Sequence, residues 1–545
     1  MVDCLIIVER NVFKPDIIHR MLQQGMETFF DALAGDNAPV DPALLKPSLS
    51  YLPNYGMAGT ISLTSVVLAT ALIEAGLSCA VLDDDDILGT YADKLPELIG
   101  RARVVAVSTT FIVSKQSLRN IVQTVRQAAP DTPLLLGGQG IPSLALDPLS
   151  GEDADIFGQV DAVMYGEAED VFPRLVKDFR DGVSHLADLP GVLYRRRGRW
   201  EGSQQPVTVD LDAVAIPDWG VLEKVDINAG RLGEALRPSS GSLEEGRGCR
   251  FGCRFCSYHL YSAFRRKSPA RIVAELKSIK ALGYDTAAFV GAEFYSPAQH
   301  SAQVLEAMAQ ARLGINSWIY GRLDYLARHP ELLEKTVAAG VSNIVFGMES
   351  GDPGILKNMG KHYDVAKMIE GTLEARRRGL TITASLIIGF PGETEATLAN
   401  TARAVAGADF NYLFLHALNV VPFTPLWRLR EQMGLKINKT GFWAHPTMTL
   451  AEVPAVARNI IRQTNRDSSS LFVNVKRNLA APFLAPGEQG DLDKLTKVVQ
   501  DVLDNEWAPE PDPAKRGELW RRVQGLAGQL PDYAFKRLQN PLSEG

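Results

Sequence analysis

The sequence predicts an α/β protein with several domains: a doubly wound parallel sheet, then a full or partial βα barrel, then a mostly helical C-terminal cap. Three observations lead to this prediction. The chain has 545 residues, too many for a single hydrophobic core. Short apolar runs alternate with amphipathic stretches up to residue 185, and the alternation begins again after residue 240. Beyond residue 430 the pattern is mostly helical.

Five apolar, strand-like runs lie in the N-terminal part, at residues 4–8, 78–82, 104–108, 133–136 and 162–165. Amphipathic stretches at 61–75, 115–129 and 172–179 predict helices between them. Strands joined by helical crossovers form a parallel sheet with helices on both faces. Ligands of such sheets bind at the carboxyl ends of the strands. We therefore expect a binding site formed by Ser108, Thr109, Gly137, Gly138, Gly166 and Glu167.

The second alternation has strand-like runs at 287–291, 316–321, 343–348, 381–388 and 412–420. Helical stretches at 269–282, 298–311, 330–339, 365–378 and 395–406 separate them. Repeated βα units predict a parallel barrel with its active site at the carboxyl ends of the strands. The predicted domains are therefore a sheet domain at 1–185, a connector at 186–240, a barrel at 241–430 and a cap at 431–545.

Charge and hydropathy exclude several classes of protein. A net charge of −7 gives no electrostatic reason to expect binding to nucleic acid or to a membrane surface. No apolar run approaches the ~20 residues that span a bilayer. The first ten residues lack the features of a signal peptide, so we expect a cytoplasmic protein.

Three of the five cysteines lie within eight residues, as Cys249, Cys253 and Cys256 in the spacing C-x3-C-x2-C. Thiolates at this density bind an iron–sulfur cluster or zinc. Three cysteines leave one iron of a [4Fe–4S] cluster open to a further ligand. The alternative is a zinc loop that takes His259 as its fourth ligand. Three arginines in the loop are expected to offset the cluster charge: Arg247, Arg250 and Arg254.

This cysteine motif, followed by an aromatic-rich stretch, resembles the radical S-adenosylmethionine (SAM) superfamily. The resemblance implies a [4Fe–4S] cluster whose open iron binds SAM, which reductive cleavage converts to methionine and a 5′-deoxyadenosyl radical. It also implies an electron donor such as flavodoxin or ferredoxin. Further motifs occur in order at predicted strand ends, over residues 243–430. By this likeness the SAM-binding residues are Gly291, Glu293, Glu349, Ser350 and Gly389.

Residues 50–180 are similar to the Rossmann-like cobalamin-binding domains that precede many radical SAM barrels. The resemblance implies that the loops after the strands bind cobalamin. Many such domains have an Asp-x-His-x-x-Gly motif whose histidine ligates cobalt. Here the only histidine before residue 185 is His19, which has the wrong spacing. We therefore expect cobalamin without a histidine lower ligand, and the open alternative is a domain that serves only as scaffold.

Together these resemblances imply a cobalamin-dependent radical SAM methyltransferase that methylates a carbon of a small-molecule or natural-product substrate through methylcobalamin. The alternatives are a radical SAM enzyme for cyclisation, oxidation or rearrangement, with or without cobalamin, and a non-catalytic zinc- or cluster-binding protein. Candidate catalytic residues near strand ends of the barrel are Tyr320, Arg322, Tyr412 and His416, with Asp324 beside them.

Overall fold

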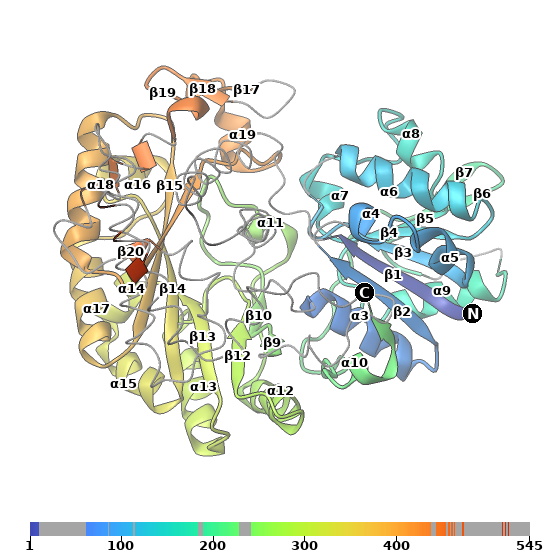
Figure 1. Ribbon diagram of the computed structural model, residues 1–545, viewed down its shortest axis with the longest axis horizontal. Helices are drawn as coiled ribbons and strands as arrows, with labels where there is room; N and C mark the ends of the chain where they lie inside the picture. The colour runs from blue at the N-terminus through green and yellow to red at the C-terminus, as the bar shows by residue number, and fades with distance from the viewer. Residues whose placement is uncertain are drawn as a thin grey trace.

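The computed structural model describes residues 1–9, 62–84, 87–112, 115–183, 189–227, 241–437 and 443–453, with scattered positions beyond. Within these residues the chain forms two α/β domains that lie side by side (Figure 1). His19 lies outside the described residues.

The N-terminal domain is built on an eight-stranded sheet with the order β7-β6-β5-β4-β3-β1-β2-β8. All pairs are parallel except β5–β6 and β6–β7. Because β1 lies between β2 and β3, the winding of the chain reverses at the β1/β3 boundary, where doubly wound sheets bind ligands. The strands are β1 (Val2–Glu9), β2 (Cys79–Asp84), β3 (Ala102–Ser108), β4 (Leu134–Gly137), β5 (Ala162–Met164), β6 (Val192–Arg196), β7 (Arg199–Gly202) and β8 (Asp226–Ile227).

The central strand β1 is buried on both faces, as expected for a parallel sheet between two helical layers. Ile6 and Val8 belong to the core that contains α3 (Leu63–Glu74) and α9 (Phe172–Arg180). Leu5 and Ile7 belong to a second core with α5 (Leu95–Gly100) and α6 (Lys115–Ala128). Alternate residues of one strand therefore hold helices on opposite faces of the sheet.

The stretch 186–240 was predicted to be a connector, but its described residues add β6, β7 and β8 to the N-terminal sheet. The 191–200 hairpin extends one edge of the sheet beyond β5, and β8 pairs with β2 at the other edge. Strand edges with free backbone groups favour this pairing, so the stretch is part of the first domain.

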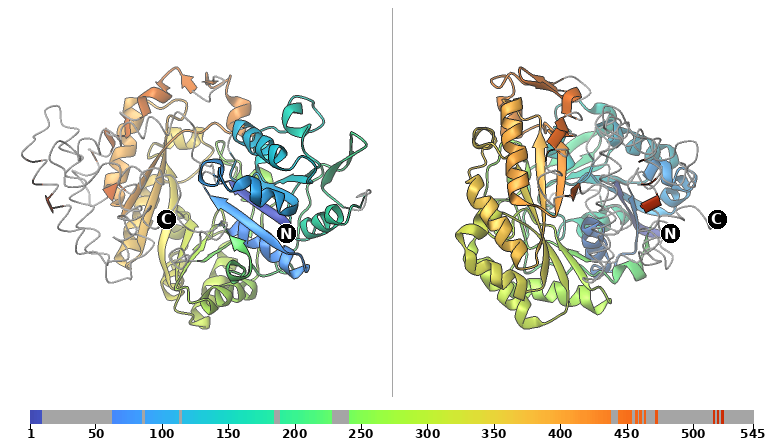
Figure 2. Two further views of the ribbon diagram at one scale, coloured as in Figure 1. Left: turned by 45° about the vertical axis from the view of Figure 1, so that its right-hand side comes forward. Right: turned by 60° about the vertical axis from the view of Figure 1, so that its left-hand side comes forward.

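The second domain is a seven-stranded, all-parallel sheet with the order β20-β16-β15-β14-β13-β12-β9. The strands described here do not close into a ring, so the barrel is partial. Helices form its outer layer, and the sheet faces the N-terminal domain (Figure 2). The strands are β9 (Gly241–Leu243), β12 (Thr286–Phe289), β13 (Asn316–Gly321), β14 (Val341–Glu349), β15 (Thr381–Ile388), β16 (Tyr412–Ala417) and β20 (Leu471–Phe472). The helices are α12 (Pro269–Ala281), α13 (Ala298–Ala311), α14 (Leu323–Arg328), α15 (Pro330–Ala338), α16 (Pro353–Asn358), α17 (Val365–Arg377), α18 (Glu395–Ala408) and α19 (Pro425–Leu429).

The region predicted as a helical cap begins with strands, while most of the scattered residues described beyond 453 are helical. A small antiparallel sheet is formed at the beginning of this region by β17 (Lys436–Ile437), β18 (Trp443–His445) and β19 (Met448–Thr449). Further along, β20 joins the barrel sheet beside β16. Most of the remaining cap lies outside the described residues.

Candidate active site

The three clustered cysteines lie in one loop between β10 (Gly246–Arg247) and α11 (Tyr258–Tyr261), and all three are free and partly buried. Backbone hydrogen bonds of Arg254 fix this loop to the barrel. Its N–H donates to the Met359 carbonyl at 2.8 Å, and its carbonyl accepts from the Leu426 N–H at 2.8 Å. Residues that follow β14 and β16 therefore position the cysteine loop.

The chemistry of these thiols fits an iron–sulfur cluster. Burial, together with the neighbouring Cys253 and Cys249, raises the pKa of the Cys256 thiol to about 11. Burial likewise raises the pKa of Cys249. A bound metal stabilises the thiolate form that such surroundings disfavour. Within the described residues no three potential ligands already stand together as a metal site, so the fit rests on the donor set and not on preset geometry.

The loop arginines have partners other than the thiols. Arg247 pairs with the carboxylates of Glu244, Glu167 and Glu169. Arg250 donates to the Ser296 hydroxyl at 3.1 Å, and Arg254 donates to the Asn358 carbonyl at 3.0 Å. The expectation that these three arginines offset the cluster charge is therefore corrected for Arg247, whose charge is already matched by carboxylates.

A cavity of about 1300 Å³ extends from the cysteine loop to the strand ends of the N-terminal sheet. Its lining includes all three cysteines and, from the N-terminal domain, Gly137 at the end of β4 and Gly138 after it. Most of the other lining side chains are apolar or aromatic, among them Phe111, Phe251, Tyr258, Trp318 and Phe423. One continuous space thus joins the two ligand-binding edges predicted from the sequence.

Gly291 lines this cavity, and its lack of a side chain allows a close approach by Glu245. The Gly291 N–H donates to the Glu245 carboxylate at 3.0 Å, and a Cβ on Gly291 would lie 2.3 Å from that carboxylate. Glu245 is completely buried, and burial raises its pKa. Glu245 was not among the residues predicted from the sequence, although it stands four residues before Cys249.

Glu293 also lines the cavity, and burial raises the pKa of its carboxyl to about 7. It accepts a hydrogen bond from the Tyr295 N–H at 2.9 Å. The positive charge of Arg322 partly offsets this rise in the Glu293 pKa. The Arg322 guanidinium stacks over the Phe251 ring at 4.4 Å and donates a hydrogen bond to Asp324 at 3.1 Å. Arg322 and Glu293 thus place opposite charges beside the cysteine loop.

Glu349 ends β14 and has a left-handed backbone, with φ of 64°. Its carboxylate pairs with Lys361 at 3.1 Å, and both residues are buried and line the cavity. Lys361 also donates to the Gly347 carbonyl. Lys361 was not predicted from the sequence, because a lone lysine after a helix carries no signal.

Two predicted SAM-binding residues do not line the cavity. Ser350 is buried, and its hydroxyl lies 3.1 Å from that of Thr401. Gly389 lies under the Trp443 ring, and its carbonyl lies 3.1 Å from Nε2 of His445. Their assignment to SAM therefore stays a prediction.

Of the four predicted catalytic residues, two line the cavity. Tyr320 and Arg322 line the cavity, whereas His416 on β16 is not among the lining residues. Tyr412 begins β16, and its side chain lies outside what the structure describes.

In the N-terminal domain, five of the six predicted binding residues line the cavity: Ser108, Gly137, Gly138, Gly166 and Glu167. The sixth, Thr109, is buried, and its hydroxyl donates to the Gly137 carbonyl at 2.9 Å. Gly138 has φ of 109°, and a Cβ there would meet Thr110 at 2.7 Å. The β4 loop therefore requires glycine where it faces the cavity.

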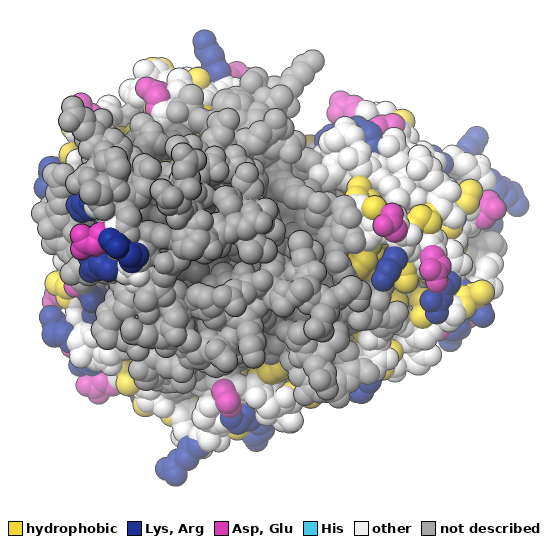
Figure 3. Space-filling model, viewed as in Figure 1, with side chains coloured by type: hydrophobic (Ala, Val, Ile, Leu, Met, Phe, Trp, Pro, Cys, Tyr) yellow, Lys and Arg dark blue, Asp and Glu magenta, His cyan; other side chains and the backbone are white. Residues whose placement is uncertain are grey.

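Figure 3 shows basic and acidic side chains interspersed over the described part of one face. No helix among the described residues is both long and apolar enough to cross a membrane.

Residues 244–405 match the model of the Radical SAM superfamily. The match covers the cysteine loop and most of the barrel, and it confirms the resemblance predicted from the cysteine spacing. It also favours the iron–sulfur interpretation of the loop over the zinc one.

Among curated proteins, the hopanoid C-3 methylase of Methylococcus capsulatus is 27% identical over 328 residues, which are 59% of this chain and 59% of the relative. The chain spans less than two thirds of the length of the curated relatives it matches.

Two solved structures are similar over nearly the whole chain. TsrM from Kitasatospora setae, solved with cobalamin and a [4Fe–4S] cluster, gives a TM-score of 0.57 at 16% identity, covering 97% of this chain and 100% of TsrM. OxsB, solved with aqua-cobalamin and SAM, gives 0.61 at 14% identity, covering 98% and 77%. These likenesses confirm the predicted fold, a Rossmann-like domain followed by a partial βα barrel.

Proposed function

We propose that this protein is a cobalamin-dependent radical SAM methyltransferase that methylates a carbon of a small-molecule substrate. The observation that carries the proposal is the single cavity, with three free thiols on one side and the glycine loops of a doubly wound sheet on the other. The methylases among its relatives, and the cobalamin and cluster bound in the proteins of similar fold, support it.

Cys249, Cys253 and Cys256 would hold a [4Fe–4S] cluster, and the loops after β3, β4 and β5 would hold cobalamin without a histidine lower ligand. When bound, the cluster supplies an electron that cleaves SAM, and cobalamin supplies a methyl carrier. That electron would come from a donor such as flavodoxin or ferredoxin.

The chain's own residues would bind SAM and exclude water. We assign Glu293, Arg322, Glu349 and Lys361 to SAM, because all four charged groups are buried beside the cysteine loop and line the cavity. Its amino and carboxylate groups need partners of both charges, which these residues provide. The apolar walls, including Phe251 and Trp318, would keep a reactive radical away from solvent.

The test is anaerobic reconstitution with iron, sulfide and hydroxocobalamin, followed by SAM and titanium(III) citrate. We expect bound iron, corrin absorbance, 5′-deoxyadenosine and S-adenosylhomocysteine. Cys253→Ala should abolish cluster binding and both nucleoside products. Cys79→Ala is the matched control, because Cys79 is a buried thiol of β2 in the N-terminal core.

A wild-type chain that binds iron but never takes up cobalamin would refute the methyltransferase proposal. Formation of 5′-deoxyadenosine by Cys253→Ala would refute the cluster assignment. A screen of candidate substrates by mass spectrometry would then identify the methylated product.

A further inference from the structure

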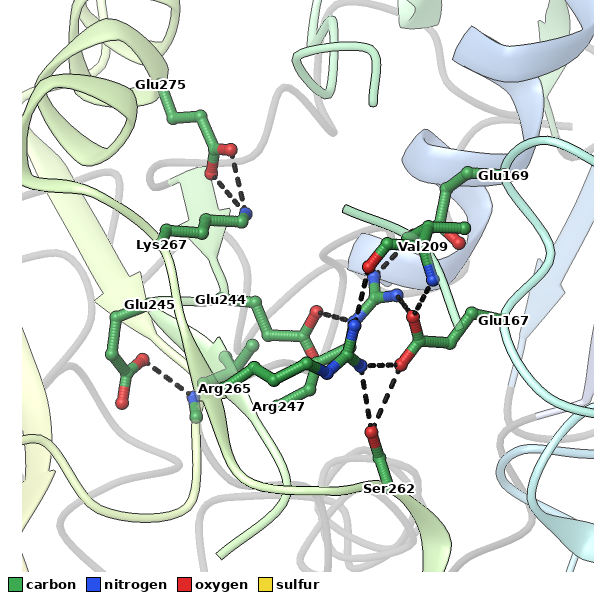
Figure 4. A network of polar contacts seen from close by, with 12 residues as sticks. Glu167, Glu169, Val209, Glu244, Glu245, Arg247, Ser262, Arg265, Lys267 and Glu275 are labelled. Atoms are coloured by element: carbon green, nitrogen blue, oxygen red, sulfur yellow. Dashed lines mark hydrogen bonds and ion pairs between the residues drawn. The ribbon is translucent and has the colours of Figure 1, made fainter. Parts of the chain in front are cut away.

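One group of polar contacts between the two domains surrounds a single carboxylate, Glu167, in the loop after β5 (Figure 4). Glu167 accepts hydrogen bonds from the Val209 N–H at 2.8 Å and from the Ser262 hydroxyl at 3.1 Å. It also pairs with Arg247 at 3.2 Å and with Arg265. Both carboxylate oxygens are therefore engaged, which leaves the carboxylate little capacity to bind a cofactor directly.

The two arginines belong to a short antiparallel ribbon in which β10 pairs with β11 (Arg265–Arg266), so that Arg247 lies opposite Arg265. All three cysteines lie in the chain segment between these two strands. Whatever holds Arg247 and Arg265 therefore holds both ends of the chain segment that contains the cysteine loop.

The backbone of the N-terminal domain around Glu167 is also constrained. Gly166 has φ of 91° and pairs with Val207, and a Cβ there would lie 2.2 Å from the Val207 carbonyl oxygen. The Glu167 N–H donates to that same carbonyl at 3.0 Å. Glu169, two residues on, provides a second carboxylate to Arg247.

We infer that Glu167, Glu169, Arg247 and Arg265 form an interdomain clamp that fixes the cysteine loop relative to the cavity edge of the N-terminal sheet. The side chains of Glu167 and Glu169 are 11% and 9% exposed, and that of Arg247 is 16% exposed. Charge pairs at this depth are screened only weakly by salt. The four residues of the clamp are positioning residues, and their role in methyl transfer rests on the function proposed above.

The clamp matters because methyl transfer joins groups held by different domains, whereas SAM cleavage uses groups held by the barrel alone. A misplacement near 1 Å can slow a reaction by about 100-fold. Loosening the clamp should therefore impair methyl transfer to the corrin more than SAM cleavage. A merely structural role would lower both activities together.

Glu167→Gln tests the clamp, because it keeps the size of the side chain and removes the charge. Arg265→Gln is a second variant that leaves the Arg247 pairs in place. The control is Asp153→Asn, which breaks the 2.7 Å pair of Asp153 with Lys115, inside the N-terminal domain.

Hydrogen exchange of the metal-free protein gives the first measurement. We expect faster exchange in residues 244–266 for Glu167→Gln and Arg265→Gln, and no change there for Asp153→Asn. Unchanged exchange in both clamp variants would overturn the inference.

The reconstituted protein, incubated with hydroxocobalamin, SAM and titanium(III) citrate, gives the second measurement. S-adenosylhomocysteine formation should fall about 10- to 100-fold relative to 5′-deoxyadenosine formation in the clamp variants. A parallel loss of both products would overturn the positioning role. If the wild type makes no S-adenosylhomocysteine, the proposed function fails, and hydrogen exchange alone decides whether the clamp exists.

Discussion

Glu349 combines two unfavourable states in one residue: a left-handed backbone and a buried charge. Such strain costs of order 1–3 kcal/mol and persists where the surrounding structure imposes it, often at functional sites. Lys361 compensates the charge, and the Glu349 charge contributes to the raised pKa of Cys256. The strained residue lines the same cavity as the three cysteines, which supports its assignment to the SAM site.

Glu393 is the basis of a pH prediction, because burial raises the pKa of its carboxyl to about 7. The protonated form is favoured in the folded state, so its stabilisation is complete below the ordinary pKa near 4.5 and is lost as pH rises through 7. A rise of the pKa from 4.5 to about 7 corresponds to about 3 kcal/mol in the free energy of unfolding. The melting temperature of the wild type should therefore fall, relative to that of Glu393→Gln, between pH 4.5 and 7.

The glutamine variant is a suitable reference because it retains an acceptor for the Gly389 N–H, which lies 2.6 Å from the Glu393 carboxylate. If the difference in melting temperature between the wild type and Glu393→Gln stays constant across this pH range, the pKa of Glu393 is not raised.

At the scale of elements, Gly389 directly follows β15 with φ of 97°, and a Cβ there would lie 2.0 Å from the Trp443 ring. Gly379 has a similar φ of 82°, but nothing lies within 4 Å of its Cβ position. Gly379→Ala should cost about 1 kcal/mol from backbone strain alone. Gly389→Ala should lower the free energy of unfolding by about 1–3 kcal/mol more, because the added methyl group overpacks against Trp443.

Urea denaturation of the two variants measures this difference. Equal losses would mean that Trp443 moves aside freely and does not fix the β15 loop.

Periodicity predicted most elements because local pattern decides them. Strands β13 and β15 begin and end where their apolar runs do, and α13 does the same. The 191–200 hairpin is also local, yet its membership of the first sheet depends on pairing with β5, which no local pattern reports.

Only part of the candidate site could be predicted from the sequence, for the same reason. The cysteine loop and the glycine loops are short motifs with their own signal. Lys361, Glu245 and the partners of Glu167 depend on contacts between residues distant in sequence, and Arg247 is 80 residues from Glu167. The packing role of Gly389 likewise depends on Trp443, from a segment that follows the barrel helices.

At the scale of the whole molecule, the two domains share one apolar core. Buried residues of β1, α3 and α9 belong to the same cluster as those of the barrel. Trp219 lies at the junction, where its indole N–H donates to the Ser242 carbonyl of β9 at 3.2 Å. The wild type should therefore unfold in one cooperative transition.

Arg247→Ala should break that cooperativity, because it leaves the carboxylates of Glu167, Glu169 and Glu244 without their shared partner. Removing one member of a buried ion pair costs about 3–5 kcal/mol. Tyr261→Phe removes another interdomain contact, the hydrogen bond with Ser143, at about 1 kcal/mol. In differential scanning calorimetry we expect two separate transitions for Arg247→Ala and one slightly shifted transition for Tyr261→Phe. If both variants melt in a single transition with similar shifts, the domains are held together by the apolar junction, and the charges around Arg247 contribute little to it.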